Sequence, residues 1–423
     1  MALSSELRAP VLLEVGFAHP SATEAPYARS DSDERGDAPP AIRAVDEIHS
    51  VAVRAGASDV HLEPTRDGGR VRQRVDGILR ESLCLPQQLF SQVVSRVKLL
   101  AAMDIADKRQ PQDGRYQIEL NDRSIDARVS SMPTINGEKL VIRLLDMRSR
   151  IPQLEQLGMP AALLAKYRRY IHAPHGFIVV TGPTGSGKTT TLYASLTERN
   201  LEAQHLCTVE DPIEVRLAGV AQVQVNVRAG LTFASALRAF VRQDPNVVMV
   251  GEMRDDETAG VAMSLALAGQ LVVTSLHAND APRTVDRLIE LGLKRHAIAS
   301  GLSGVLAQRL VRKLCIDCRK RIPLSVDDAS LLGIAPGSVA FEASGCRVCD
   351  DTGYVGRTGI FEFMPVTSAV RDAIAEGGSS VIIAERARAA GFTAMVADGA
   401  SRVAAGETSV SELRRVLSLG VDE

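Results

Sequence analysis

One segment of the sequence, GPTGSGKTT at residues 182–190, constrains the fold more than any other feature. It matches the pattern G-x-x-x-x-G-K-[ST], and it lies between an apolar run, FIVVT, and a helical pattern, TTTLYASLTERN. A loop of this kind holds phosphate on backbone N–H groups at a helix N-terminus, so it needs a buried strand before it and a helix after it. The segment therefore predicts a doubly wound α/β core with a parallel sheet.

Each residue type in this P-loop has a role in binding ATP. Glycine lets the backbone approach the phosphates, Lys188 supplies a cation for the β- and γ-phosphate oxygens, and the Thr189 hydroxyl is placed to ligate Mg²⁺. The alternative is a glycine-rich turn that binds nothing, but the bare pattern arises by chance in only on the order of one chain in a hundred of this length. The expected nucleotide-binding residues are Gly182, Pro183, Thr184, Gly185, Ser186, Gly187, Lys188, Thr189 and Thr190.

A second apolar run, VVMV, ends in Gly251-Glu252 instead of the aspartate that usually helps to hold Mg²⁺. The acid for the metal must then come from another strand end, because open α/β sheets collect their ligands at the carboxyl edge. The run LCTV stops at Glu210 and Asp211, which are the expected donors, through water. Glu252 is then available to orient or deprotonate the attacking water. A charged turn is the alternative for Glu210-Asp211, and the presence of the P-loop outweighs it.

A further apolar run, LVVTSL, leads directly into His277. Its imidazole would lie at the same edge of the sheet, where it could hydrogen-bond the γ-phosphate and sense its loss. The alternative is a lone histidine that caps the turn before Asn279. These strand ends predict one hydrolytic site, with Lys188, Glu210, Glu252 and His277 as the catalytic candidates.

Four of the six cysteines form two C-x-x-C pairs, Cys315 with Cys318 and Cys346 with Cys349. Four thiolates from two such turns suit a closed tetrahedral Zn²⁺ site, which would fix an insert too small to build its own core. Unliganded or redox-active thiols are the alternative. The other two cysteines, at positions 84 and 207, lie in apolar runs and are expected in the core.

Composition limits the class of protein. The chain has 423 residues, 45% of them hydrophobic, which is enough for two or three packed domains. Forty-nine basic and 51 acidic side chains leave a formal charge of −2, which gives no general attraction to nucleic acid. No apolar run approaches the roughly 18 residues needed to cross a bilayer, and the N-terminus does not have the pattern of a signal peptide. We therefore expect a cytoplasmic protein with reduced or metal-bound cysteines.

Changes of pattern along the chain predict five segments. The start is rich in charge, Gly and Pro, the next part alternates β-patterned and helical runs with a hairpin at Asp76-Gly77, and apolar strands then alternate with long helices. The expected segments are a flexible leader (1–40), a small α+β domain (41–150), the α/β ATPase core (151–312), a tetracysteine module (313–366) and a C-terminal helical region (367–423).

Taken together, these residues resemble the secretion ATPases of type II secretion and type IV pilus systems, particularly the general secretion pathway protein E family. The resemblance extends from about Ala57 to the C-terminus. The segment IASGLSGVLAQRLVRKLC is more similar to the type II secretion branch than to the pilus extension branch, and the cysteines argue against the retraction ATPases. The resemblance is carried by ASDVHLEP, KRQPQDGR, the P-loop, VEDPIE, VVMVGEMRD, LHAND, AQRLVRKLC and the paired C-x-x-C motifs.

The resemblance implies a RecA-like core with a PAS-like N-terminal domain, assembled as a homo-hexamer that binds ATP, Mg²⁺ and Zn²⁺. It implies an ATPase attached peripherally to the inner membrane through platform and cytoplasmic-domain proteins of the secretion machinery, where ATP hydrolysis drives pseudopilus assembly and protein export. It further implies that the N-terminal domain supplies arginines to the phosphates, namely Arg128 and Arg143, with Arg115 as a third. Arginine suits this role because its guanidinium is always charged and offers several fixed donors. Spare charge on a β-rich surface is the alternative.

The sequence departs from the family pattern at two places. Gln270 stands where the histidine motif commonly begins with a histidine, and we expect the large N-terminal docking domain of many relatives to be absent, with ELRAPVLLEVGFAHP as its remnant. Three other functions stay open: a type IV pilus assembly ATPase, a nucleic-acid motor and a non-catalytic scaffold. The near-neutral charge and the lack of aromatic-rich basic segments count against the motor. Lys188, Thr189 and Glu252 count against the scaffold.

Overall fold

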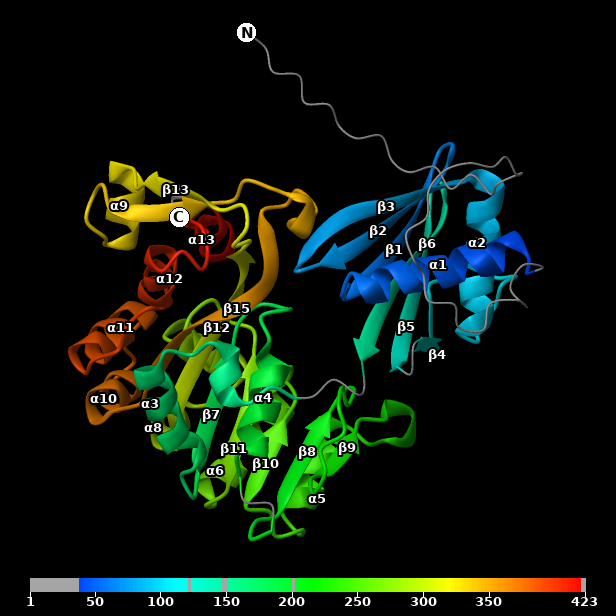
Figure 1. Cartoon of the computed structure of the whole chain (residues 1–423). Coiled ribbons are helices and arrows are strands. Elements are labelled where there is room, and N and C mark those ends of the chain that lie inside the picture. Colours follow the sequence, from blue (N-terminus) through cyan, green and yellow to red (C-terminus); the bar gives the residue numbers. More distant parts are fainter. Residues whose placement is uncertain (1–37, 121–122, 147–150, 200–201, 420–423) are drawn as a thin grey trace. The chain divides into compact units, whose positions relative to one another are not determined.

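The computed structural model describes residues 38–120, 123–146, 151–199 and 202–419. The chain folds into two compact units, residues 1–149 and residues 150–423 (Figure 1). The leader expected over residues 1–40 lies outside the described residues as far as residue 37. No helix in the described ranges is both long and apolar enough to cross a bilayer.

The first unit is an antiparallel sheet with two helices packed on its apolar face. Its six strands are ordered β3-β2-β1-β6-β5-β4, and every neighbouring pair is antiparallel. Side chains of both helices and of the sheet form one core. The elements are α1 (Pro40–Arg54), β1 (Asp59–Thr65), β2 (Gly68–Val75), β3 (Ile78–Pro86), α2 (Gln87–Leu100), β4 (Gln112–Leu120), β5 (Arg123–Thr134) and β6 (Gly137–Asp146).

Local sequence explains this sheet. In β1, Val60 and Leu62 are fully buried in the core, whereas Glu63 lies on the opposite, polar face, because successive strand residues point to alternate sides. The hairpin from β2 to β3 turns through Asp76 and Gly77, whose φ angles of 50° and 83° suit a two-residue hairpin turn. The predicted hairpin is therefore confirmed, while the PAS-like assignment of this unit stays a prediction.

A buried ion pair ties α2 to the sheet. The side chain of Lys98 is 1% exposed and that of Glu138 is 6% exposed, and Lys98 Nζ lies 2.6 Å from Glu138 Oε1. Lys98 also donates to the carbonyl oxygen of Asp107 at 2.8 Å, in the segment that precedes β4. A buried pair adds little net stability, but removing one partner leaves an uncompensated charge at a cost of about 3–5 kcal/mol. The pair therefore fixes α2, β6 and this segment in one arrangement.

The second unit is built on a seven-stranded sheet, ordered β15-β12-β7-β11-β10-β8-β9. All neighbouring strands are parallel except β12 and β15, which are antiparallel. Its elements up to the last parallel strand of the sheet are α3 (Ala161–Ile171), β7 (Gly176–Thr181), α4 (Lys188–Thr197), β8 (Leu206–Glu210), β9 (Ala221–Gln224), α5 (Phe233–Phe240), β10 (Val247–Val250), α6 (Asp256–Leu267), β11 (Leu271–Leu276), α7 (Arg283–Glu290), α8 (Arg295–Gly301) and β12 (Leu302–Leu314).

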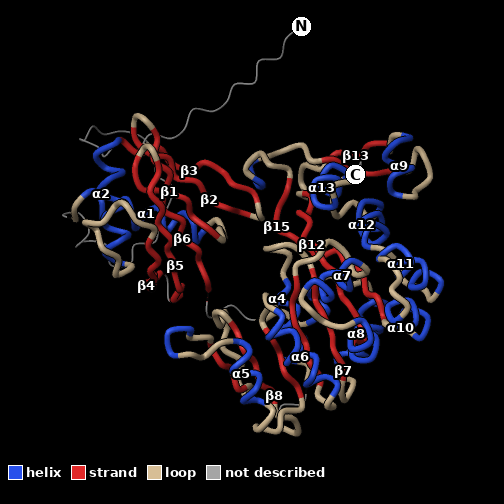
Figure 2. Tube along the Cα trace, turned by 180° about the vertical axis from the view of Figure 1, so that it is seen from behind, coloured by secondary structure: helices blue, strands red, loops and turns tan. Residues whose placement is uncertain are grey.

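Helices cover both faces of this sheet. All six residues of β7 are buried, and they alternate between two cores: Ile178 and Val180 pack with α3 and α4, whereas Phe177 and Val179 pack with α5, α6, α7 and α8. Figure 2, seen from behind, shows the second group of helices in front of the strands. The doubly wound α/β prediction is confirmed.

The chain leaves the sheet after β12 and returns to it through β15 (Tyr354–Pro365). The cysteine pairs and a small two-stranded sheet lie between these strands, and four helices follow, so the predicted tetracysteine cluster and C-terminal helices are confirmed. The boundaries expected at residues 312–313 and 366–367 stay predictions. The remaining elements are β13 (Lys320–Pro323), α9 (Val326–Leu332), β14 (Val339–Glu342), α10 (Ser368–Ala375), α11 (Ser380–Ala389), α12 (Met395–Ala404) and α13 (Val410–Leu417).

Candidate functional site

The P-loop connects the end of β7 to the start of α4. Gly182, Gly185 and Gly187 have φ angles of 152°, 77° and 87°, which side chains with a Cβ rarely adopt. The last of these precedes the first residue of α4, Lys188. The glycines thus let the chain turn from strand to helix within one short loop, which leaves the helix N-terminus directed at a phosphate position.

Lys188 is the buried cation of this loop. Only 9% of the residue is exposed, and Nζ donates to the carbonyl oxygens of Gly182 at 2.8 Å and Pro183 at 3.0 Å. Burial lowers the pKa of Lys188 to about 8, which the charge of Glu252 opposes and that of Arg309 reinforces. The ammonium group therefore titrates close to neutral pH, although a lysine side chain ordinarily stays charged to above pH 10.

Glu252 and His277 lie beside this lysine. His277 Nδ1 is 3.4 Å from Lys188 Nζ, and His277 Nε2 is 4.0 Å from Glu252 Oε2. Burial and the charge of Lys188 lower the pKa of His277 below that of a free imidazole, which favours the neutral form of the ring. Glu252 also pairs with Arg254. The structure thus brings together three of the predicted catalytic residues from the ends of β10 and β11 and from the start of α4.

Glu210 occupies a different environment, in the interior at the end of β8. It is 2% exposed, and its carboxylate accepts hydrogen bonds from Thr208 at 2.6 Å, from Gln222 at 3.1 Å and from the hydroxyl of Tyr193. The same Tyr193 hydroxyl accepts the backbone N–H of Glu214 at 3.2 Å. Glu210 is therefore connected through one tyrosine to the backbone of Glu214.

Glu214 is the residue that sequence reasoning missed. Its Oε1 lies 3.4 Å from the hydroxyl of Thr189, the side chain expected to bind Mg²⁺. Asp211, the other predicted acid, is exposed at the start of the same segment. The sequence did contain this residue in a recognised motif, because Glu214 ends VEDPIE. The metal-side role was instead predicted for Glu210 and Asp211, the two acids of the motif that directly follow the apolar run.

The predicted arginines meet on the polar face of the first unit. Arg115 pairs in register with Arg128, and Arg128 with Arg143, so that one row crosses β4, β5 and β6. These side chains line a pocket of about 590 Å³. Arg128 is 3.5 Å from Asp126, and Arg143 is 3.2 Å from Asp59. A guanidinium group carries several fixed donors of the kind that phosphate oxygens accept.

The departure at Gln270 lies away from the P-loop. Gln270 directly precedes β11, and its carbonyl oxygen accepts the backbone N–H of Gly176 at the start of β7. His277 follows the opposite end of the same strand. Gln270 is therefore at the amino edge of the parallel sheet, whereas the P-loop and the histidine are at its carboxyl edge.

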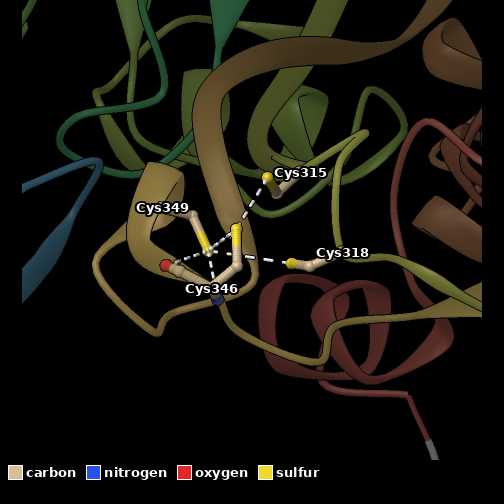
Figure 3. A group of neighbouring side chains, drawn as sticks. All are labelled: Cys315, Cys318, Cys346 and Cys349. Carbon is tan, nitrogen blue, oxygen red and sulfur yellow. Dashed lines mark hydrogen bonds between the residues drawn. The ribbon is translucent and has the colours of Figure 1, made fainter.

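The four paired cysteines form one cluster (Figure 3). Sγ–Sγ distances are 3.9 Å for Cys315 and Cys346, 3.7 Å for Cys318 and Cys349, and 3.7 Å for Cys346 and Cys349. Tetrahedral zinc with Zn–S bonds of about 2.3 Å requires sulfurs about 3.8 Å apart, so the arrangement fits that metal.

Hydrogen bonds also favour a thiolate at this cluster. The backbone N–H groups of Cys346 and Gly353 donate to Cys349 Sγ at 3.2 and 3.1 Å. Burial raises the pKa of Cys349, but these donors and the neighbouring thiols outweigh it and lower the pKa to about 7. Of the other cysteines, Cys207 is in the core as expected, whereas Cys84 is only partly buried, so its core placement was wrong. On the edge strand β3, Cys84 instead contacts Glu81.

Comparison with known proteins assigns the chain to a family. The family model described as Type II/IV secretion system protein matches residues 34–415. The chain belongs to this family. The matched residues include the P-loop, the strand ends beside it, the arginine row and the cysteine cluster, so every part of the candidate site lies within the family match.

Two relatives are similar to this Type II/IV secretion system protein in sequence, and one solved structure is similar to it in fold. The Type II secretion system ATPase E of Vibrio cholerae serotype O1 is 45% identical over 386 residues, which cover 90% of this chain and 76% of the relative. The Type IV pilus assembly ATPase PilB of Acinetobacter baylyi is 42% identical over 395 residues, 91% of this chain and 68% of PilB. The X-ray structure of the Legionella pneumophila ATPase DotB matches with a TM-score of 0.64 at 20% identity, covering 90% of this chain and 97% of DotB, which shows the shared fold.

The lowered pKa of Lys188 predicts that phosphate binding depends on pH. Only the protonated lysine attracts phosphate, so above its pKa of about 8 the affinity for ADP falls with rising pH, by about tenfold per unit, and binding takes up a proton. Calorimetric titration with ADP between pH 7 and 9 measures the affinity. Repeating it in Tris and in HEPES gives the number of protons taken up, because the two buffers release protons with different heats. Residual binding by Lys188→Met serves as the control and takes up no proton at this site. Constant affinity of the native chain over this range would contradict the prediction.

Proposed function

We propose that this chain is a cytoplasmic ATPase that works as a homo-hexamer to drive pseudopilus assembly and protein export in type II secretion. The observation that carries the proposal is the meeting of Lys188, Glu252 and His277 beside the P-loop. Membership of the family and 45% identity to a type II secretion ATPase support the same function. Partner proteins of the inner-membrane platform would then hold it at the membrane.

ATP with Mg²⁺ would supply the phosphoryl group and the charge that neutralises it, and the residues of this chain would position both. The P-loop N–H groups and Lys188 would bind the phosphates, and the Thr189 hydroxyl would ligate the metal. Glu252 takes the proton of the attacking water, and neutral His277 hydrogen-bonds the γ-phosphate oxygens. Such positioning is most of what an enzyme contributes to phosphoryl transfer.

The acids of VEDPIE act on the metal side of this proposed site. Glu214 lies next to Thr189 and would hold the water shell of a bound Mg²⁺, an ion that dehydrates reluctantly. Glu210 contributes through Tyr193, whose hydroxyl holds the backbone of Glu214. Asp211, exposed in the same segment, adds negative charge near the metal.

Replacement of Glu252 tests the hydrolytic function directly. We expect Glu252→Gln to bind ATP normally but to turn it over about 10²–10⁴-fold more slowly, because the amide cannot accept a proton. Steady-state phosphate release and ATP binding by the full-length chain measure the two effects. The matched control is Glu257→Gln, which removes a carboxylate paired with Arg238 on the surface and should leave turnover unchanged. Turnover near the native rate in Glu252→Gln would overturn the assignment.

The arginine pocket of the first unit is proposed to complete the phosphate site in the assembled hexamer. We expect Arg128→Ala and Arg143→Ala each to lower turnover by about 10³-fold, as other phosphate-binding arginines do, with the fold unchanged. Arg54→Ala is the control, because it removes an exposed arginine of α1 that pairs with Glu47 at 3.4 Å and lies outside the arginine row. Phosphate release and circular dichroism report activity and folding. Native turnover in both pocket variants would exclude this role.

We further propose that the cysteine cluster holds one structural Zn²⁺. Four thiols at tetrahedral spacing leave no position for water, so the metal would hold the two knuckles together and take no part in hydrolysis. The bound metal would join the two ends of the segment between β12 and β15. It would thereby stabilise this segment, whose own sheet has only two strands.

Metal analysis tests this site. The native chain, purified without chelator, should contain one zinc per chain, and Cys318→Ser should contain none, because a hydroxyl is a poor zinc ligand at neutral pH. Cys84→Ser is the control, since Cys84 lies outside the cluster, and it should retain the metal. A native chain without zinc, or equal zinc in native and Cys318→Ser protein, would contradict the proposal.

A type IV pilus assembly ATPase is the second candidate, and the 42% identity to PilB favours it specifically. Both candidates use the same hydrolytic site, so the variants above do not separate them. Expression in two hosts, one lacking its secretion ATPase and one lacking its pilus ATPase, separates the two candidates. The chain should restore secretion or pilus assembly, whichever machinery it matches.

A further inference from the structure

The AQRLVRKLC motif has no role in the site described so far, although it forms most of the second half of β12. The strand β12 lies beside β7 and is more than twice as long, with 13 residues against six. Their pairing ends at Ala307 and Thr181, and β12 then continues with β15 as far as Leu314. The P-loop leaves β7 at this point. Gln308 is therefore the first residue of β12 that lies beside the P-loop instead of beside β7.

Gln308 forms hydrogen bonds with the P-loop and with the helix α4 that follows it. It is 2% exposed, its Nε2 donates to the carbonyl oxygen of Ser186 at 2.7 Å, and its Oε1 accepts the hydroxyl of Thr191 at 2.8 Å. The fit is close: a Cβ at Gly182 would stand 2.5 Å from the carbonyl oxygen of Gln308, and one at Gly187 would stand 3.2 Å from Nε2. The path of the P-loop backbone is thus set by the side chain and the carbonyl group of this one residue.

Arg309 points to the other side of β12 and holds a different segment. It is 7% exposed, and its Nη2 donates to the carbonyl oxygen of Asn279 at 2.6 Å. Asn279 follows His277 by two residues, in the loop between β11 and α7. The same loop is held from β15, where Glu362 accepts the backbone N–H of Ala281 at 2.7 Å. The β12–β15 pair therefore fixes the loop that carries the histidine.

We propose that Gln308 and Arg309 are positioning residues for the two halves of the nucleotide site, a role that rests on the proposed ATPase function. Gln308 sets the P-loop backbone that binds phosphate, so its loss weakens nucleotide binding. Arg309 sets the loop of His277, which acts during hydrolysis, so its loss lowers turnover and leaves binding nearly unchanged. Two adjacent residues on opposite sides of one strand thus control separate properties of the site.

The Gln308 half is tested by ADP binding to the full-length chain. We expect Gln308→Met, which leaves the Ser186 carbonyl unpaired, and Gln308→Glu, which keeps an acceptor for Thr191 but has no donor for Ser186, to raise the Kd by about tenfold. Thr191→Val removes only the other hydrogen bond and should change the Kd by about twofold or less. If Gln308→Met does not fold, Gln308→Glu carries the test. Native affinity in the Gln308 variants, or an equal loss in Thr191→Val, would overturn this half.

The Arg309 half is tested by separating turnover from binding. At pH 7, where Lys188 is mostly protonated with or without the charge of Arg309, we expect Arg309→Met to lower kcat by about tenfold or more with an ADP Kd within about threefold of native. Arg309→Lys, which keeps a donor for Asn279, should recover part of kcat. Arg312→Met is the matched control on the same strand, because it removes an ion pair with Glu412, which Arg415 still contacts, and perturbs the sheet without touching the site. An equal fall of kcat in Arg312→Met, or a fall in ADP affinity of Arg309→Met that matches its loss of kcat, would overturn this half.

ADP binding by the native chain distinguishes a failure of the proposed function from a failure of the roles given to Gln308 and Arg309. A native chain that binds no ADP would overturn the proposed function and this inference together. Native binding with unaltered behaviour of the Gln308 and Arg309 variants would overturn the inference alone and leave the ATPase assignment in place.

Discussion

The complete burial of β7 is the constraint on which the rest of the structure depends. Strands flank it on both sides and helices cover both of its faces, so it can end only at the middle of the carboxyl edge of the sheet. The phosphate-binding loop must therefore emerge there. Neighbouring parallel strands end at the same edge, which is why side chains distant in sequence meet beside Lys188. Chemistry at this site follows from the packing of one six-residue strand.

This constraint explains what could be predicted from sequence. The motif identified the loop, and the rule that parallel strands share a carboxyl edge was enough to bring Glu252 and His277 to it. Local pattern could not show that the chain after Pro212 turns back, so Glu214 was missed. It also gave no role to Gln308, whose partners are 122 and 117 residues away in the sequence. Contacts between residues so far apart in sequence depend on which strands become neighbours in the sheet. The spacing of residue types along the chain does not show which strands these are.

The arginine row shows the same limit in an antiparallel sheet. Alternation along each strand predicts which residues share a face, but only the register of β4, β5 and β6 decides that Arg115, Arg128 and Arg143 stand side by side. The resemblance to a family supplied these residues, and the backbone pairing explains why they form a single group. Whether an acid such as Asp59 also joins the row is again a matter of register.

The antiparallel pairing of β12 and β15 has a consequence for the identity of the side chain beside the P-loop. Because successive residues of a strand face opposite ways, a slip of β12 by one residue in one direction would put Arg309 in the place of Gln308 and a cation against the phosphate-binding backbone. The pairing already shifts between Arg312 and Leu314, immediately before Cys315. Ahead of that shift the register is unbroken from Gly304 to Arg312, and this continuous pairing keeps a neutral amide facing the nucleotide loop.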